Sequence, residues 1–128
     1  RELQRELGMS IIFVTLDVGV ASEISDRIAV MYAGRFMEYG TAEELLLDPR
    51  HPYTSSLLRS TVHGAMRGQR LDAIPGLPPD LLNLPPGCPF APRCRHAAPI
   101  CEKPVALAKT ADGRQTACAR AAELLEPA

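Results

Sequence analysis

The sequence predicts an α/β unit followed by a small, irregular, proline-rich extension that a cross-linking group staples together. A continuous apolar run rich in β-branched residues, 11–14, is typical of a strand buried on both faces of a parallel sheet. Nine of the twelve prolines lie between Pro75 and Pro104, where they disfavour regular helices and strands. All four cysteines lie in this second part, which is too short to bury a large core.

The chain starts with the end of a helix. Leu3 and Leu7 have the i, i+4 spacing of one helix face, and Gly8 suits a left-handed C-terminal cap. Because Arg1 stands inside this helix and is not a methionine, we expect a further N-terminal portion to precede it. Residues 11–14 then form the predicted central strand.

A short helix and a hairpin are predicted next. Asp17 can accept a backbone N–H at the start of a helix that runs to residue 24. Residues 27–32 and 35–39 are strand candidates on either side of Ala33 and Gly34, which suit a tight turn.

Two more helices complete the first part, residues 1–60. Thr41 and Glu44 have capping-box spacing, which predicts a helix through residue 47. Pro52 suits the first position of another helix that ends at about residue 60. Residues 61–73 are then predicted to be a linker, and residues 74–128 form the extension.

Charge and hydropathy exclude several classes of function. The 14 basic and 15 acidic residues nearly cancel, so the chain lacks the basic footprint of a nucleic-acid-binding protein. The longest apolar run, residues 28–33, is far shorter than the roughly 20 residues that cross a bilayer. With no signal peptide in view, we expect a cytoplasmic chain that reaches a membrane only through partners.

The cysteines are the main candidates for a functional site, and they stand at Cys88, Cys94, Cys101 and Cys118. Disulfides would require an oxidising compartment, for which the sequence carries no export signal. Zinc and a 4Fe-4S cluster can both be held by four thiolates. Four unrelated buried thiols are the simplest alternative, because free cysteine is a common core residue.

Spacing and charge do not decide between the two metals. The pattern C-x5-C-x6-C-x16-C lacks the short C-x(2–4)-C pairs that structural zinc sites usually contain. Arg93, Arg95 and Lys103 outnumber Glu102 near the first three cysteines, which suits an anionic cluster. Irregular four-cysteine sites nevertheless occur with both metals, so zinc and the cluster stay level at this point.

The histidines are predicted to have lesser roles. His51 precedes Pro52 and is expected to begin a helix rather than bind metal, because the nearest cysteine is 37 positions away. His63 falls in the linker and should be solvated. His96 lies among the cysteines and is expected to hydrogen-bond to a bound group rather than ligate it.

Three groups of residues, taken in order, resemble one protein family. The first resembles the end of an ABC-type nucleotide-binding domain, with its switch strand followed by a strand and hairpin: residues 11–17 (IIFVTLD), 25–35 (SDRIAVMYAGR) and 38–40 (EYG). The second resembles the segment that follows this domain in oligopeptide, dipeptide and nickel importers: residues 51–54 (HPYT) with Leu57 and Leu58. The third resembles the C-terminal extension of that group: residues 74–79 (IPGLPP), 85–94 (PPGCPFAPRC), Cys101, Glu102 and Cys118.

The order and spacing of these stretches resemble the C-terminal part of the ATP-binding subunit of the oligopeptide/dipeptide ABC importers. In that family the four-cysteine extension resembles a 4Fe-4S-binding region. The resemblance therefore favours a cluster held by all four cysteines, with zinc as the alternative. It also implies a second ATPase subunit and membrane permease subunits as partners, with a substrate-binding protein as an indirect one, at the inner face of the cell membrane.

The resemblance also limits the expected catalysis. The family holds ATP and magnesium with a G-x-x-x-x-G-K-S/T loop, and this sequence contains no such stretch. The signature motif and the catalytic glutamate should likewise precede Arg1. By itself, the chain is therefore expected neither to bind nor to hydrolyse nucleotide.

One position departs from the family pattern. Leu16 stands where the family has the switch histidine that contacts the γ-phosphate, whereas the adjacent Asp17 matches the family. Leucine has no hydrogen-bond donor, so the resemblance implies an ATP site that binds nucleotide but hydrolyses it poorly. A deliberate substitution, a sequence error and a decayed copy are alternatives. For the chain as a whole, a free-standing metal-binding module and a non-functional remnant are the competing interpretations.

Overall fold

The computed structural model of the chain describes residues 1–61 and 72–124. The elements in chain order are α1 (Glu2–Leu7), α2 (Val18–Ile24), β1 (Arg27–Tyr32), β2 (Arg35–Thr41), α3 (Ala42–Leu47), α4 (Pro52–Arg59), the 3-10 turns η1 (Ala91–Arg93) and η2 (Pro99–Glu102), β3 (Ala108–Lys109), β4 (Gln115–Thr116) and α5 (Ala121–Leu124). Most of the predicted linker, with His63, lies outside the described residues. None of the described helices is both long and apolar enough to cross a membrane.

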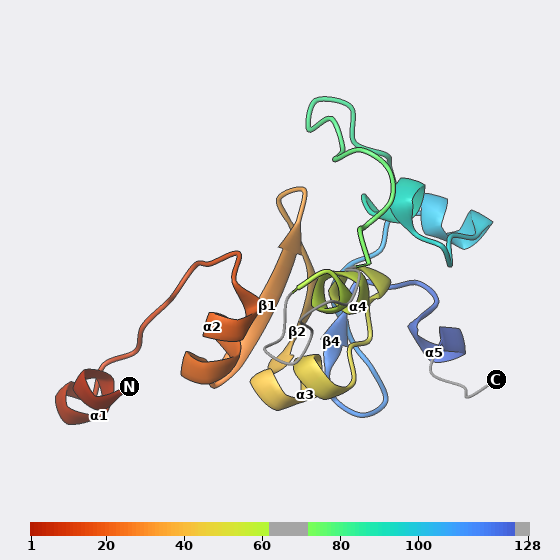
Figure 1. Cartoon of the computed structure of the whole chain (residues 1–128). Helices are drawn as coiled ribbons and strands as arrows, with labels where there is room; N and C mark the ends of the chain where they lie inside the picture. The colour runs from red at the N-terminus through yellow and green to blue at the C-terminus, as the bar shows by residue number, and fades with distance from the viewer. Residues whose placement is uncertain (62–71, 125–128) are drawn as a thin grey trace.

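The hairpin of β1 and β2 is the centre of the fold (Figure 1). The two strands pair antiparallel from Arg27 opposite Thr41 to Tyr32 opposite Arg35. The turn residues Ala33 and Gly34 both have positive φ, 49° and 75°, as a two-residue hairpin turn of type I′ requires. The predicted hairpin is confirmed, and its second strand runs two residues further than expected.

The extension adds two short strands to this hairpin, which the sequence did not predict. Together they give a four-stranded antiparallel sheet in the order β1-β2-β4-β3. Beside the ladder, the Ala117 N–H donates to the Met37 carbonyl at 2.8 Å. The first part and the extension therefore share one sheet, although residues far apart in sequence form it.

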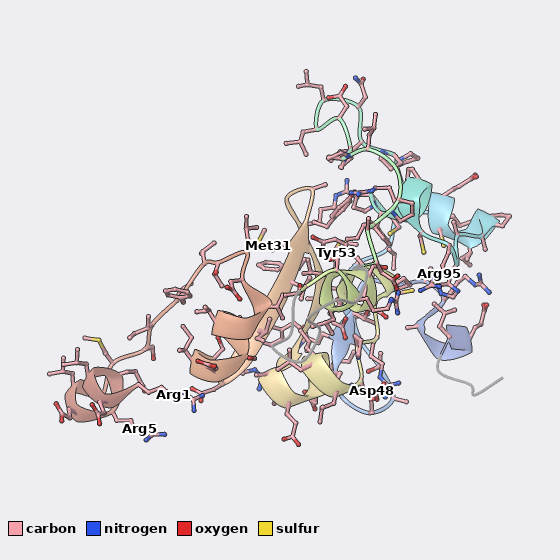
Figure 2. The ribbon with its side chains drawn as sticks, in the orientation of Figure 1. Arg1, Arg5, Met31, Asp48, Tyr53 and Arg95 are labelled. Carbon is pink, nitrogen blue, oxygen red and sulfur yellow. The ribbon has the colours of Figure 1, made fainter. Side chains whose placement is uncertain are left out.

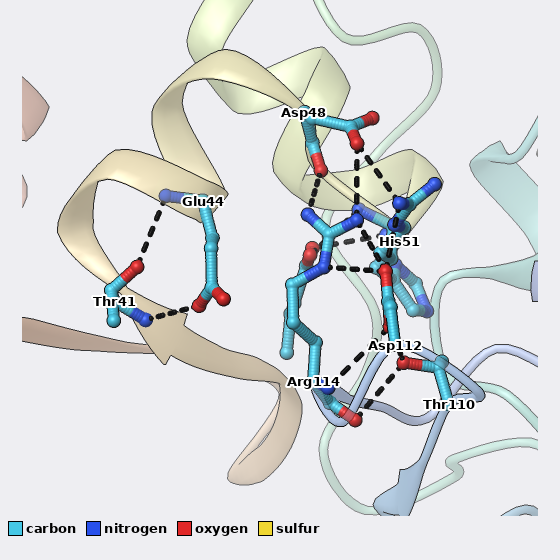
Figure 3. A network of polar contacts seen from close by, with 9 residues as sticks. Thr41, Glu44, Asp48, His51, Thr110, Asp112 and Arg114 are labelled. Atoms are coloured by element: carbon cyan, nitrogen blue, oxygen red, sulfur yellow. Dashed lines mark hydrogen bonds and ion pairs between the residues drawn. The ribbon is translucent and has the colours of Figure 1, made fainter.

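The predicted helices are confirmed, together with the signals that begin and end them. Asp17 caps α2 by accepting the Val20 N–H at 3.1 Å. At α3, the Glu44 carboxylate accepts the Thr41 N–H at 2.8 Å and the Thr41 hydroxyl accepts the Glu44 N–H at 3.2 Å, which completes the capping box (Figure 3). Gly8 ends α1 in the left-handed conformation, with φ of 61°.

The buried parallel strand predicted at residues 11–14 is not formed. Residues 11–14 belong to no strand, and no other part of residues 1–61 and 72–124 pairs with them. The side chains of Ile12 and Val14 are 94% and 91% exposed. A strand becomes buried only when neighbouring strands and covering helices supply its partners, and the described residues supply neither.

A small aromatic core joins the hairpin, α4 and the extension. Tyr32 lies 4.6 Å from Tyr53 and 5.4 Å from Phe90 between ring centroids. Phe90 and Met37 are almost fully buried, and Cys88 belongs to the same cluster. Figure 2 labels Tyr53 in this region, where α4 faces the extension. Aromatic packing therefore anchors the extension beside the sheet.

Candidate functional site

The loop that carries the first three cysteines is irregular, as its prolines predict, and is held by backbone contacts. The Cys88 N–H donates to the Cys101 carbonyl at 2.9 Å, which brings the two cysteine segments together. Gly87 makes this approach possible, because a Cβ there would lie 2.0 Å from the Cys101 carbonyl oxygen. The backbone thus places Cys88 and Cys101 side by side.

Arg93 fixes the same loop to the rest of the molecule. Its guanidinium donates to the Tyr32 hydroxyl at 3.1 Å and to the carbonyls of Ile74 and Pro75 at 3.2 and 2.8 Å. These contacts occupy the forked donors of arginine. Arg93, which the sequence suggested as a cation for an anionic cluster, therefore serves to attach the extension to β1.

The four cysteines line a single small cavity of about 20 Å³, and His51 and His96 line it with them. Cys88 is buried and the other three are half-buried. Pro52 at the start of α4 and Leu124 at the end of α5 also line this cavity. Arg95, which lies close to α5 (Figure 2), is not among the residues that line it. Sequence reasoning thus identified a set of thiols that the fold brings to one place.

Burial controls the electrostatics of these thiols. It raises the pKa of Cys88 and Cys94, and it raises the pKa of Cys118 to about 11. Backbone N–H groups two residues further along the chain, those of Phe90, His96 and Arg120, lower the pKa of these three thiols and oppose the larger effect of burial. N–H groups aimed at sulfur stabilise a thiolate once a cation replaces the proton.

The four thiols have the right chemistry for a four-thiolate metal group, but their present positions do not form a metal-binding geometry. Four sulfurs around one apolar cavity, three of them with N–H donors, have the chemistry that zinc and iron–sulfur clusters use. In residues 1–61 and 72–124, however, no three His, Cys, Asp or Glu side chains are arranged so that they could hold a metal ion. A metal ion or cluster bound by all four thiols would therefore need an arrangement of the donors different from this one.

His51 reaches the cysteines from the start of α4. Its Nδ1 accepts the Tyr53 N–H at 3.0 Å, so the predicted role at the start of a helix is confirmed. Its Nε2 lies 3.9 Å from the Cys88 sulfur. The side chain is 2% exposed, and burial lowers its pKa to about 4. The fold therefore brings His51 to Cys88 across the 37 positions that separate them, the distance in sequence that argued against His51 as a metal ligand.

A polar network holds the segment before α4 in place (Figure 3). The buried Glu38 carboxylate on β2 accepts the Arg50 N–H at 2.6 Å and the His51 N–H at 2.9 Å. Arg114 joins Asp48, at the end of α3, to Asp112 in the loop between β3 and β4. The network positions the backbone from which the His51 ring projects toward the thiols.

The remaining predicted site residues lie in the first part of the chain. Leu16 is 99% exposed and makes no part of the thiol cavity. Asp17 has the capping role described for α2.

Two residues near the thiols escaped sequence reasoning. His51 was set aside on sequence separation, although its position directly before a predicted helix indicated a side chain with a fixed direction. Arg120 lies two residues after Cys118, and its charge lowers the pKa of Cys94 against the larger effect of burial. Its place close to the last cysteine was the one signal that could have identified it.

Comparison with known proteins assigns the family. Residues 37–101, about half of the chain, match the family model described as "Oligopeptide/dipeptide transporter, C-terminal region". This range contains most of β2, all of α3 and α4, and the first three cysteines.

Individual relatives agree over a longer range. The chain is 46% identical over 124 residues to the oligopeptide transport ATP-binding protein OppD of Salmonella typhimurium, which covers 97% of this chain and 37% of the relative. It is 45% identical over 103 residues to the dipeptide transport ATP-binding protein DppD of Bacillus subtilis, covering 80% of this chain and 31% of the relative. A putative peptide import ATP-binding protein of Brucella ovis is 48% identical over 111 residues, 82% of this chain and 33% of the relative.

The chain thus spans about a third of the length of the curated relatives that it matches. The chain belongs to the oligopeptide/dipeptide transporter family, and it corresponds to the C-terminal region of that family's ATP-binding subunits.

Proposed function

We propose that the chain is the C-terminal part of an ATPase subunit that powers ATP-dependent uptake of oligopeptides or dipeptides by an ABC importer. Its support is the similarity to peptide-transport ATP-binding proteins over most of the chain. The intact subunit would act with a second ATPase subunit and with permease subunits at the inner face of the membrane. A substrate-binding protein would deliver the peptide.

The DNA upstream of the Arg1 codon tests this proposal. An in-frame phosphate loop, signature motif and catalytic glutamate are expected there, because the chain itself contains no phosphate loop. A stop codon or unrelated sequence immediately upstream would overturn the proposal and favour a free-standing metal-binding module or a non-functional remnant.

Leu16 gives the intact subunit a second expected property. Leucine offers no donor to a γ-phosphate or to an attacking water, so the ATP site that uses this position should bind nucleotide and hydrolyse it slowly. In the full-length subunit, Leu16→His is expected to raise ATP turnover with little change in nucleotide affinity. Equal turnover in both proteins would contradict this role for position 16.

For the extension, we propose that Cys88, Cys94, Cys101 and Cys118 hold a four-thiolate metal group, a 4Fe-4S cluster in the first instance and zinc as the alternative. The observation that carries the proposal is that all four thiols line one cavity. When bound, the group would supply a cross-link between the segments that carry the cysteines. This role suits a part of the chain with short strands and a small core.

A cysteine substitution tests the cross-link. Cys94→Ser is expected to lower the metal content of chain purified without oxygen and to speed proteolysis within residues 85–118. Ala97→Ser, an exposed position in the same loop, is the matched control because it adds the same side chain without removing a thiol. If both variants keep the wild-type metal content and protease resistance, Cys94 is not part of a metal site.

A further inference from the structure

The His51 ring is the one imidazole that joins the first part of the chain directly to a cysteine among the described contacts. Its two nitrogens face different partners: Nδ1 lies 3.0 Å from the Tyr53 backbone nitrogen, and Nε2 lies 3.9 Å from the Cys88 sulfur. The Tyr53 N–H can only donate, so Nδ1 must be the acceptor and cannot carry a proton. A neutral ring in this position carries its proton on Nε2.

The Nε2–H group is therefore directed at sulfur. A cap alone does not require this geometry, because asparagine or aspartate would accept the same backbone N–H. The imidazole adds a second polar atom on the opposite side of the ring, inside the cavity that the four cysteines line. An N–H donor facing sulfur in such a dry environment interacts more strongly than it would in water.

The ring is also held rigidly. The His51 backbone N–H is bound by the buried Glu38 carboxylate at 2.9 Å, and the ring packs near Phe90 with 6.3 Å between centroids. The contact of Nδ1 with the Tyr53 N–H restricts rotation of the ring about the Cβ–Cγ bond of His51. The direction of Nε2 is thus fixed before any ligand enters the cavity.

We infer that His51 is a positioning residue for the thiol site, and that its Nε2–H donates to the Cys88 sulfur and links the start of α4 to whatever that sulfur binds. The inference rests on the proposed four-thiolate group. The bond stabilises negative charge on the Cys88 thiolate, so it should slow the loss of metal. In an iron–sulfur cluster it should also raise the reduction potential, because the reduced form is the more negative one.

Two variants separate this role from helix capping. Asparagine places its carbonyl oxygen near the position of Nδ1, so His51→Asn keeps the cap but removes the donor to sulfur. Glutamine places its amide nitrogen near the position of Nε2, so His51→Gln keeps a donor to sulfur but loses the cap. The wild-type chain and both variants are purified without oxygen and compared at equal metal content.

The two variants are expected to have opposite effects: His51→Asn changes the properties of the bound metal, and His51→Gln changes the stability of the fold. His51→Asn should keep the wild-type thermal stability but release metal to a chelator about tenfold faster. Its reduction potential should fall if the metal is iron–sulfur; if the metal is zinc, the thiolate-to-cobalt charge-transfer band of the cobalt-loaded chain should move to lower energy. His51→Gln should be less stable in its metal-free form yet keep the wild-type potential or band. A wild-type potential or band in His51→Asn overturns the inference while leaving the metal proposal intact.

The protonated nitrogen of His51 can be identified in the wild-type chain, even if the variants fail to fold and no metal is bound. Nitrogen-15 NMR of the histidine-labelled wild-type chain should show one histidine with the proton on Nε2 and with an Nδ1 shift typical of an acceptor; loss of this signal in His51→Asn assigns it. A proton on Nδ1 of His51 overturns the inference. If the purified chain contains no metal but His51 carries its proton on Nε2, the metal proposal is overturned. The inferred bond from His51 to Cys88 is then retained.

Discussion

Arg114 reaches from the loop after β3 to Asp48 at the end of α3, 66 positions earlier in the chain (Figure 3). Its Nη1 donates to the Asp48 carbonyl at 2.7 Å and its Nη2 donates to the Asp48 carboxylate at 3.0 Å. The same guanidinium donates to Asp112 at 2.7 and 2.9 Å. One side chain thereby fixes the extension to the segment that leads into α4 and His51.

Replacing this guanidinium should weaken the whole arrangement. Lysine keeps the charge but cannot span the Asp48 carbonyl and both carboxylates, so Arg114→Lys should lower the free energy of unfolding by about 1–3 kcal/mol. The Arg114 side chain is only 7% exposed, so solvent cannot readily replace the lost bonds. Urea unfolding measures the effect. Arg1→Lys, at an exposed ion pair with Asp26, is the control and should change the value by less than about 0.5 kcal/mol.

Replacing Glu38 by the similarly shaped glutamine should lower the free energy of unfolding about as much as Arg114→Lys does. In Glu38→Gln one carboxylate oxygen becomes an NH₂ group facing a backbone N–H, so either Arg50 or His51 loses its acceptor. We expect a loss of about 1–3 kcal/mol in unfolding free energy and faster hydrogen exchange at residues 50 and 51. Glu43→Gln on the exposed side of α3 is the matched control. Unchanged exchange at both amides would show that Glu38 does not hold this segment.

Gly87 should be required for metal binding as well as for stability. In Gly87→Ala the new Cβ would meet the Cys101 carbonyl oxygen and the Glu102 backbone, so the two cysteine segments must separate. We expect reduced metal content, measured by elemental analysis. Gly113→Ala is the comparison, because its φ of 84° strains an alanine by about 1–2 kcal/mol while no atom lies within 4 Å of the Cβ. Gly113→Ala should therefore lose stability but keep metal; equal metal content in both variants would contradict the close approach at Gly87.

Acid should destabilise the metal-free chain through His51. Burial holds the folded-state pKa at about 4 against 6.5 for an unperturbed histidine. Between these values the unfolded chain binds a proton that the folded chain does not, so stability is fully present above about pH 6.5 and is lost as the pH falls toward 4. The loss between pH 7.5 and 5.0 is on the order of 2 kcal/mol. His51→Asn should remove most of this dependence in thermal unfolding; an identical pH dependence in both proteins would contradict a buried neutral imidazole.

The sequence predicted the elements whose signals are local. The capping box of Thr41 and Glu44, the Asp17 cap and the Ala33–Gly34 turn each depend on residues within four positions of one another. The convergence of the cysteines was also predictable, because a short proline-rich extension needs a cross-link.

The remaining features depend on partners distant in sequence. Strands β3 and β4 have two residues each, too few for a periodic pattern. They form because β4 pairs with the edge of β2 and β3 then pairs with β4. The contact of His51 with Cys88 and that of Arg114 with Asp48 likewise follow from the tertiary fold. Residues 11–14 show the converse case, in which a strong strand pattern finds no partner among the described residues.

The metal and sulfide content of the chain purified without oxygen measures the proposed cross-link directly. A 4Fe-4S cluster held by Cys88, Cys94, Cys101 and Cys118 predicts about four iron and four sulfide per chain. About one zinc per chain without iron would replace the cluster by the zinc alternative and keep the four-thiolate site. A folded chain with neither metal, and with all four thiols free to react with an alkylating reagent, would contradict the metal-stapled extension.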